Sequence, residues 1–179
     1  MLKVLILTGS PHSKGTTALL ADEVYIGAKE AGHDVIRIET AKLDVHPCLG
    51  CYHCRKNDGR YVYDDDMKQI YSHLMTADVV ILVTPLYYFG MTAQLKRVVD
   101  RFFAINPILR KTSKRLYLIA ACGDKDKWAM DALVLHFQTL CRYLHWQEEG
   151  KVLAIGAYTR EDLKDSEYPM LARNLGTEL

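Results

Sequence analysis

The chain has 179 residues, of which 49% are hydrophobic and 25% are charged, and its formal net charge at neutral pH is +1. This balance gives no support for nucleic acid or an anionic membrane as the main partner. No stretch approaches the roughly 20 consecutive apolar residues of a membrane span. We expect one domain over residues 1–179, close to the usual upper size for a single core.

The chain starts directly with an apolar strand pattern, so we expect no signal peptide and a cytoplasmic location. Its five cysteines are an odd number. In a cytoplasmic protein the default is reduced thiols rather than a disulfide framework.

Strand and helix patterns alternate along the sequence. We expect a strand at 2–8, a helix at about 15–31, an edge strand at 34–40, an irregular insert at 41–63 and a helix after the acidic residues 64–66. A buried strand at 78–83, a helix at about 95–103, a strand at 115–121, a helix at about 125–145, a strand at 151–157 and a helix at about 161–174 follow. Five β/α units predict an α/β three-layer sandwich, whose ligands bind at the carboxyl ends of its strands.

Residues 8–17, Thr-Gly-Ser-Pro-His-Ser-Lys-Gly-Thr-Thr, join the first strand to the first helix. Free N–H groups and the positive end of the helix dipole favour an anion at such a turn. Four hydroxyl groups can add donors there: Ser10, Ser13, Thr16 and Thr17. Lys14 precedes Gly15, which reverses the order of a Walker loop.

A dinucleotide is disfavoured at this loop, because Pro11 stands where the fingerprint needs its second glycine. Glu39 ends the second strand roughly where a ribose-binding acid would fall, and we interpret it as a surface carboxylate. The loop therefore predicts a single terminal phosphate monoester.

The next strand-end loop, residues 84–91, contains three aromatic residues, a proline and a glycine. Aromatic side chains at a sheet end are costly unless they cover something flat and apolar. Burial under a neighbouring loop or a second subunit explains them equally well when this loop is taken alone. Beside a phosphate loop, a planar ring with a phosphate arm is the better explanation. The short loop of residues 121–124 would bring backbone N–H groups to the other edge of that ring.

Three segments in this order resemble the flavodoxin-like NAD(P)H-dependent FMN reductases, and within them the branch that includes the iron–sulfur flavoproteins. The segments are residues 9–17, residues 84–90 (Thr-Pro-Leu-Tyr-Tyr-Phe-Gly) and residues 96–101 (Lys-Arg-Val-Val-Asp-Arg), and the similarity spans about residues 1–125. The resemblance implies a flavodoxin-like fold with a five-stranded parallel sheet in the order 2-1-3-4-5. It also implies non-covalently bound FMN as cofactor.

The same resemblance assigns cofactor-binding residues by position. The phosphate would be held by Ser10, Ser13, Gly15, Thr16 and Thr17, with His12 and Lys14 balancing charge in the same loop. The isoalloxazine ring would contact Pro85, Leu86, Tyr87, Tyr88, Phe89 and Gly90, with Cys122 and Gly123 at its other edge. In this family the helix at about 95–103 often lies at a dimer interface. The resemblance therefore implies a homodimer or higher homo-oligomer, with Arg97 and Arg101 available to pair across subunits; a core helix explains the pattern equally well.

The insert carries the motif Cys48-x-x-Cys51-x-x-Cys54. A four-iron cluster normally takes four thiolates, and the iron–sulfur flavoproteins have a fourth cysteine before an Asp-Asp-Met stretch. This chain has the Asp-Asp-Met stretch, but Tyr61 stands roughly where the fourth cysteine is expected. We therefore assign no metal to the loop.

Three interpretations of these thiols stay open. The first is metal-free thiols, which include a redox-active Cys48–Cys51 pair. The second is a zinc or labile iron site that His46 or His53 would complete. The third is an iron–sulfur cluster.

Several other residues are expected to have structural roles. Cys141, Trp128 and Trp146 are expected to pack, His136 and His145 are not expected to be catalytic, and residues 110–115 are expected to form a solvated basic run.

The resemblance implies an enzyme that accepts hydride from NAD(P)H and passes electrons to a quinone, a flavin, a nitro compound or another small acceptor. Flavin carries such chemistry, so no catalytic side chain is expected, and backbone N–H groups beside the ring would stabilise its reduced form. One alternative is an electron-carrier flavoprotein reduced by a partner protein, although dedicated carriers tend to be strongly acidic. Another is a metal- or redox-sensing module built on the cysteine loop.

Overall fold

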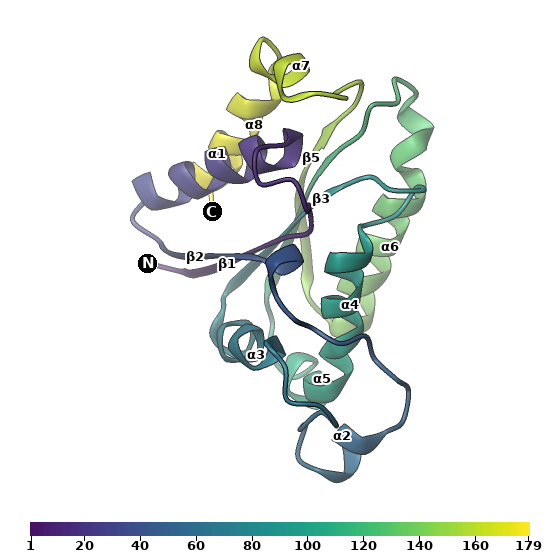
Figure 1. The fold of residues 1–179 in the computed structure, drawn as a ribbon. Helices are drawn as coiled ribbons and strands as arrows, with labels where there is room; N and C mark the ends of the chain where they lie inside the picture. Colours follow the sequence, from purple (N-terminus) through teal and green to yellow (C-terminus); the bar gives the residue numbers. More distant parts are fainter.

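The computed structural model describes residues 1–179 and contains one parallel five-stranded sheet with the order β2-β1-β3-β4-β5 (Figure 1). The strands are β1 (Lys3–Thr8), β2 (Asp34–Glu39), β3 (Val79–Pro85), β4 (Arg115–Ala121) and β5 (Gln147–Ala154). This order confirms the predicted flavodoxin-like topology. The central strand β3 is buried from Val79 to Thr84, as its continuous apolar sequence predicts.

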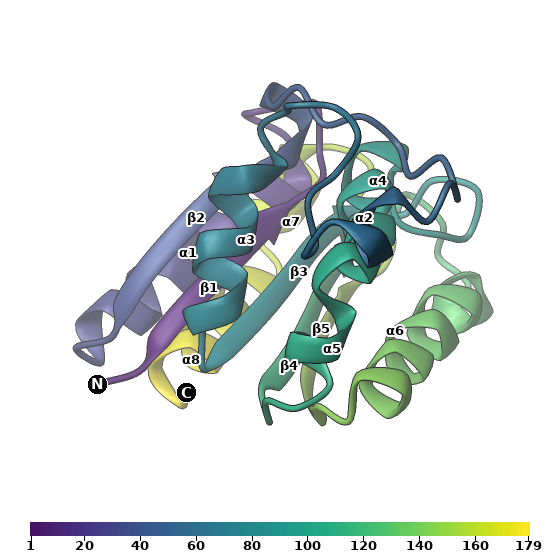
Figure 2. The same ribbon diagram turned by 90° about the horizontal axis from the view of Figure 1, so that it is seen from below.

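Helices cover both faces of the sheet (Figures 1 and 2). One face is covered by α1 (Thr16–Glu30), α7 (Arg160–Lys164) and α8 (Tyr168–Thr177). The other is covered by α3 (Met67–Thr76), α4 (Ala93–Arg101), α5 (Asn106–Leu109) and α6 (Asp131–Leu144). The short elements are the 3-10 helices η1 (Thr40–Lys42), η2 (Phe102–Ile105) and η3 (Lys127–Met130) and the helix α2 (His53–Lys56).

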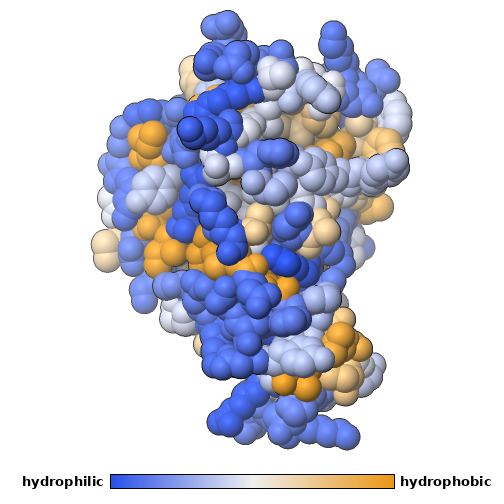
Figure 3. Space-filling view, viewed as in Figure 1, coloured by the Kyte–Doolittle hydropathy of each residue, from blue (hydrophilic) through white to orange (hydrophobic).

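Two hydrophobic cores result, one on each side of the sheet. Figure 3 shows a mainly hydrophilic surface on the face seen in Figure 1, interrupted by apolar residues between the two helix layers. None of the helices combines the length and the apolar character that crossing a membrane requires.

Three predicted elements in the second half were wrong in their bounds. β5 starts at Gln147 rather than at residue 151, because polar residues suit an exposed edge strand, and it ends at Ala154 rather than at 157. The helix predicted at 125–145 is divided into η3 and α6. The helix predicted at 161–174 is divided into α7 and α8, and a proline in the first turn of α8 gives that helix its own start.

The predicted solvated run at 110–115 was also wrong at one position. Lys114 is only 3% exposed, and its ammonium group donates to the Ala77 carbonyl at 2.5 Å. Burial lowers the pKa of this lysine below its usual value, although the nearby Asp78 carboxylate partly opposes the decrease. Lys114 therefore joins the start of β4 to the segment that precedes β3.

The buried side chain of Thr92 connects the loops that follow β1 and β3. Its hydroxyl donates to the Gly9 carbonyl at 2.7 Å and accepts the Leu95 N–H at 3.3 Å, capping α4. Its own N–H donates to the Thr84 hydroxyl at 3.0 Å. A Cβ atom on Gly9 would lie 2.5 Å from the Thr92 hydroxyl, so only glycine allows this approach.

Thr92→Val tests this connection. The variant loses an N-cap, worth about 1 kcal/mol, and leaves the buried Gly9 carbonyl without this donor, which costs about 1–3 kcal/mol. We expect urea unfolding to show a total loss of about 2–4 kcal/mol. The exposed Thr76 hydroxyl bonds only within its own helix, so Thr76→Val should change stability by less than about 0.5 kcal/mol. Equal losses in the two variants would contradict the role of Thr92.

Candidate functional site

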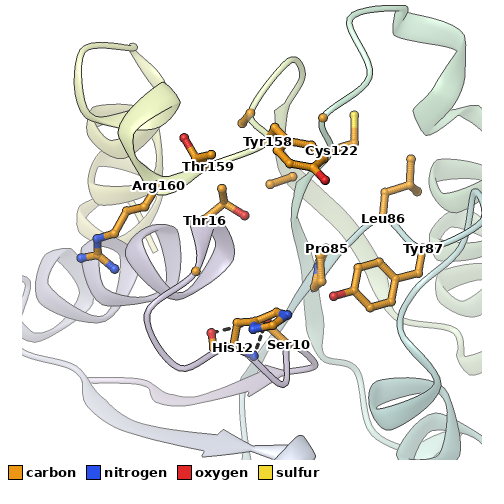
Figure 4. Close-up of a pocket in the computed structure, with 14 residues that line it drawn as sticks. Ser10, His12, Thr16, Pro85, Leu86, Tyr87, Cys122, Tyr158, Thr159 and Arg160 are labelled. Carbon is orange, nitrogen blue, oxygen red and sulfur yellow. Dashed lines mark hydrogen bonds between the residues drawn. The ribbon is translucent and has the colours of Figure 1, made fainter.

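A pocket of about 420 Å³ opens at the carboxyl end of the sheet (Figure 4). Its walls come from the loops that follow β1, β3, β4 and β5. The lining residues are Ser10, His12, Gly15, Thr16, Pro85, Leu86, Tyr87, Ala121, Cys122, Gly123, Ala157, Tyr158, Thr159 and Arg160. Most predicted residues of all three loops thus meet in one cavity.

One end of the pocket is formed by the β1–α1 turn. The Ser10 hydroxyl accepts the His12 N–H at 3.1 Å, and the Gly15 N–H donates to the His12 carbonyl at 3.1 Å. Gly15 is the N-cap of α1 and has no side chain to cap it. The first-turn N–H groups of α1 therefore lack an intrahelical or side-chain partner, which favours an anion here.

Not every predicted residue of this turn lines the pocket. Ser10, His12, Gly15 and Thr16 do, whereas Ser13 and Lys14 are exposed outside it. Thr17 is buried, with 2% of its surface exposed. The group of Thr17 that suits an anion is therefore its backbone N–H, which lies in the first turn of α1.

The opposite end of the pocket is less polar. Pro85, Leu86 and Tyr87 line it, and the Leu86 N–H donates to the Ala121 carbonyl at 2.8 Å, which holds the β3 and β4 loops together. Burial raises the pKa of the Cys122 thiol, although backbone hydrogen bonds partly oppose the increase. Cys122 is therefore a neutral thiol at physiological pH.

The turn Tyr87–Gly90 presents its aromatic residues beyond the pocket. Tyr87 and Gly90 exchange backbone hydrogen bonds of 3.0 and 3.1 Å, and the two residues between them have positive φ angles, +46° at Tyr88 and +62° at Phe89. Tyr88 is fully exposed. Tyr88, Phe89 and Gly90 do not line the pocket, in contrast to Tyr87.

The segment after β5 was not predicted as part of the site. The Ala157 N–H donates to the Cys122 carbonyl at 2.7 Å, and this contact turns the chain back over the β4 loop. Tyr158 packs so closely that a Cβ atom on Gly123 would lie 2.5 Å from its ring. The available signal was the capping box of Thr159 and Asp162, which marks a helix start directly after a strand.

The cysteine loop lies away from this pocket. Cys48, Cys51 and Cys54 are free thiols that line a separate small cavity together with Tyr61 and Arg101. No group of three or more His, Cys, Asp and Glu side chains is placed so that it could hold a metal ion.

The buried side chain of Arg101 packs against this loop. Its guanidinium pairs with Asp65 at 2.5 Å, both side chains are 2% exposed, and the Tyr61 ring covers it at 3.2 Å. The Tyr61 hydroxyl donates to the Pro47 carbonyl at 2.5 Å. Burial favours a raised pKa for Asp65, but hydrogen bonds from Arg101 and the backbone outweigh it and lower that pKa.

Of the two explanations for the arginines of α4, the structure supports the core helix, because both side chains form hydrogen bonds within the chain. Arg101 is held by Asp65 as described, and Arg97 donates to the carbonyls of Thr40 and Leu43 at 3.1 and 2.8 Å. The expectation of a packed Trp128 was wrong. This side chain is 57% exposed and stacks on Phe89. Trp146 and Cys141 are buried as predicted.

Comparison with known families and proteins gives consistent relationships. The family described as NADPH-dependent FMN reductase matches residues 2–160. An iron–sulfur flavoprotein of Methanocaldococcus jannaschii is 34% identical over 130 residues, which cover 70% of this chain and 64% of that protein. A second one from this organism is 37% identical over 100 residues, covering 56% and 51%. The chain thus spans between half and two thirds of the length of these curated relatives.

Other known proteins match over nearly their whole length. A putative NAD(P)H-dependent FMN-containing oxidoreductase of Bacillus subtilis is 26% identical over 174 residues, covering 92% of this chain and 91% of that protein. Among solved structures, the NAD(P)H:quinone oxidoreductase of Methanothermobacter marburgensis has a TM-score of 0.75 at 15% identity, covering 99% and 95%. An azoreductase of Bacillus anthracis has a TM-score of 0.76 at 14% identity and covers both chains completely. These structures share the fold of this chain.

Proposed function

This chain belongs to the NADPH-dependent FMN reductase family, and we propose that it catalyses NAD(P)H + H⁺ + acceptor → NAD(P)⁺ + reduced acceptor, with FMN as cofactor. The acceptor is a quinone, a flavin or another small molecule that takes up two electrons. The observation that supports this proposal most strongly is the single pocket in which the β1–α1 turn faces the loops after β3 and β4.

The residues present fit FMN. The cavity volume of about 420 Å³ lies in the usual range for cofactor sites. One end offers hydroxyl groups and free N–H groups at the start of α1, which suit a phosphate. The other end offers Pro85, Leu86 and Tyr87, which suit a flat apolar ring.

Bound FMN supplies the redox chemistry, and the chain binds and orients it. Ser10 and Thr16 would hold the phosphate, together with the N–H groups in the first turn of α1. Leu86 and Tyr87 would contact the ring, and the backbone of Cys122 and Gly123 would contact its polar edge. The neutral Cys122 thiol needs no chemical role.

Thr16→Val tests the phosphate end. The loss of a hydrogen bond to a charged group costs about 1.5–3 kcal/mol, so the Kd for FMN should rise about 10- to 100-fold. The Kd for riboflavin, which lacks the phosphate, should stay within about twofold of its wild-type value. Fluorescence titration measures both, with Thr177→Val as a surface control. If both ligands are weakened equally, the Thr16 hydroxyl supports the fold and not the phosphate.

Anaerobic stopped-flow mixing tests the reductase against the electron carrier. We expect NADH or NADPH to bleach the flavin absorbance of the FMN-loaded protein at rates of about 1 s⁻¹ or faster, as is usual for enzymes. The near-neutral composition, with 23 Lys and Arg against 22 Asp and Glu, favours the reductase, since electron carriers tend to be strongly charged. Slow reduction by both nucleotides would favour a carrier.

We also propose that the cysteine loop of this chain binds no iron–sulfur cluster, although the two M. jannaschii relatives are named iron–sulfur flavoproteins. Only three thiols line its cavity, whereas a four-iron cluster takes four thiolates. Tyr61 is already engaged with Pro47 and Arg101. Anaerobic reconstitution with iron and sulfide, followed by desalting, should leave less than about one iron per chain; about four irons with an absorbance band near 400 nm would contradict this.

We also propose that the chain forms a homodimer, that it is located in the cytoplasm and that its acceptor is a small molecule.

A further inference from the structure

The cysteine loop takes no part in the proposed reductase site, although it holds three of the five thiols. Cys48 and Cys51 are exposed, Cys54 is half-buried, and all three line one cavity of about 20 Å³ outside the FMN pocket. Figure 1 shows the loop around α2 projecting from the lower end of the molecule. The thiols do not combine with any His, Asp or Glu into a group that could hold a metal ion. The loop therefore offers accessible thiols whose placement is not that of a metal site.

The backbone favours a bond between Cys48 and Cys51. The chain bends at Gly50, directly before Cys51, where φ is +64°. Glycine at positive φ in the third position is typical of a four-residue turn, whose first and fourth Cα atoms lie within about 7 Å of each other. A disulfide needs Cα atoms about 4.4–6.8 Å apart. The two ends of this bend are thus suited to a disulfide.

Tyr61 is a shared neighbour of the same two thiols. Burial raises the pKa of Tyr61, the Arg101 charge opposes this increase, and the thiolates of Cys48 and Cys51 add to it. Both thiols therefore lie near one hydroxyl group. This hydroxyl also donates to the Pro47 carbonyl at 2.5 Å, which fixes the residue directly before Cys48.

The other three thiols are less suited to oxidation or to this pairing. Burial raises the pKa of Tyr71, and the thiol that adds to this increase is Cys54, which therefore lies toward α3. Cys122 and Cys141 are buried, and burial raises the pKa of both thiols, to about 11 for Cys141. Because the thiolate is the reactive form, these two should stay reduced while the loop is oxidised.

We propose that Cys48 and Cys51 form a reversible intramolecular disulfide, which makes the loop a peroxide-sensitive modification site. One thiol attacks hydrogen peroxide, so that an S–O bond forms, the O–O bond breaks, and a sulfenic acid and one water result. The second thiol then attacks the sulfenic sulfur and releases a second water. Two thiols are oxidised and one peroxide is reduced to two waters. A dithiol reductant restores both thiols by exchange.

This inference does not depend on the reductase function, and peptide mapping tests it. The FMN-loaded protein is treated with hydrogen peroxide in the presence of a chelator and without NAD(P)H, then denatured, alkylated with N-ethylmaleimide and digested with trypsin. No Lys or Arg lies between Lys42 and Arg55, so residues 43–55 form one peptide with all three loop cysteines. We expect this peptide to lose two hydrogen atoms and to carry a single alkyl group, on Cys54. The protein without FMN should give the same result, because the loop lies outside the pocket.

Three variants identify the pair. Cys54→Ser is the matched control and should still form the disulfide, which leaves its peptide without an alkyl group. Cys51→Ser removes one partner, so dimedone, which labels sulfenic acids, should label Cys48 in this variant and not in the wild type. Cys141→Ser should form the disulfide as the wild type does. Cys48 and Cys51 are exposed, so replacing either one removes no core packing.

Each of four results would overturn the proposal. The peptide could retain three alkyl groups after peroxide treatment, or Cys54→Ser could abolish the disulfide. A non-reducing gel could show that the bond links two copies of the chain. The thiols could also resist peroxide until the chelator is added, which would make the loop a metal site. The expected result is a bond within one chain that forms in Cys54→Ser, is absent in Cys51→Ser and is reversed by dithiothreitol.

Discussion

The site depends on the hydrogen bonds of one buried hydroxyl group. The Thr92 hydroxyl donates to the Gly9 carbonyl and caps α4, and the Thr92 N–H donates to the Thr84 hydroxyl. Through these contacts the turn after β1 and the loop after β3 keep a constant separation. A cofactor that has an anionic arm and a flat ring needs two binding regions at a fixed distance, because effective binding requires both to be organised before the ligand arrives. Gly9 is part of the same constraint, since any side chain there would displace the hydroxyl.

The parallel sheet provides the second level of organisation. All five strands deliver their following loops to one edge, and four of these loops meet in the pocket. Polar donors gather where α1 begins, and apolar and aromatic residues gather after β3. The turn with Tyr88 and Phe89, both at positive φ, lies outside the pocket and faces solvent. The cysteine loop lines a different cavity. It packs on the buried Arg101–Asp65 pair, which the Tyr61 ring covers.

Sequence reasoning located the parts in which local pattern and tertiary environment agree. The continuous apolar run of β3 and the regular spacing of Leu95, Val98 and Val99 in α4 correctly indicated burial. The turn after β1 was predicted because glycine and hydroxyl residues between a strand and a helix start are typical of an anion-binding turn. Elements stabilised by position alone were missed: β5 begins with polar residues because it is an edge strand, and Tyr158 reaches the pocket only because the chain turns back after Ala154. The sequence could not choose between a core role and an interface role for Arg101, because its partner, Asp65, is 36 positions away and no local pattern reveals such a pair.

A crystal structure of the FMN complex tests the central claim most directly. The account predicts that the phosphate lies within hydrogen-bonding distance of the backbone N–H groups at the start of α1 and of the Thr16 hydroxyl. It also predicts that the ring lies against Leu86 and Tyr87, with its polar edge toward Cys122 and Gly123. A phosphate bound elsewhere, or a ring that contacts none of these residues, would contradict it.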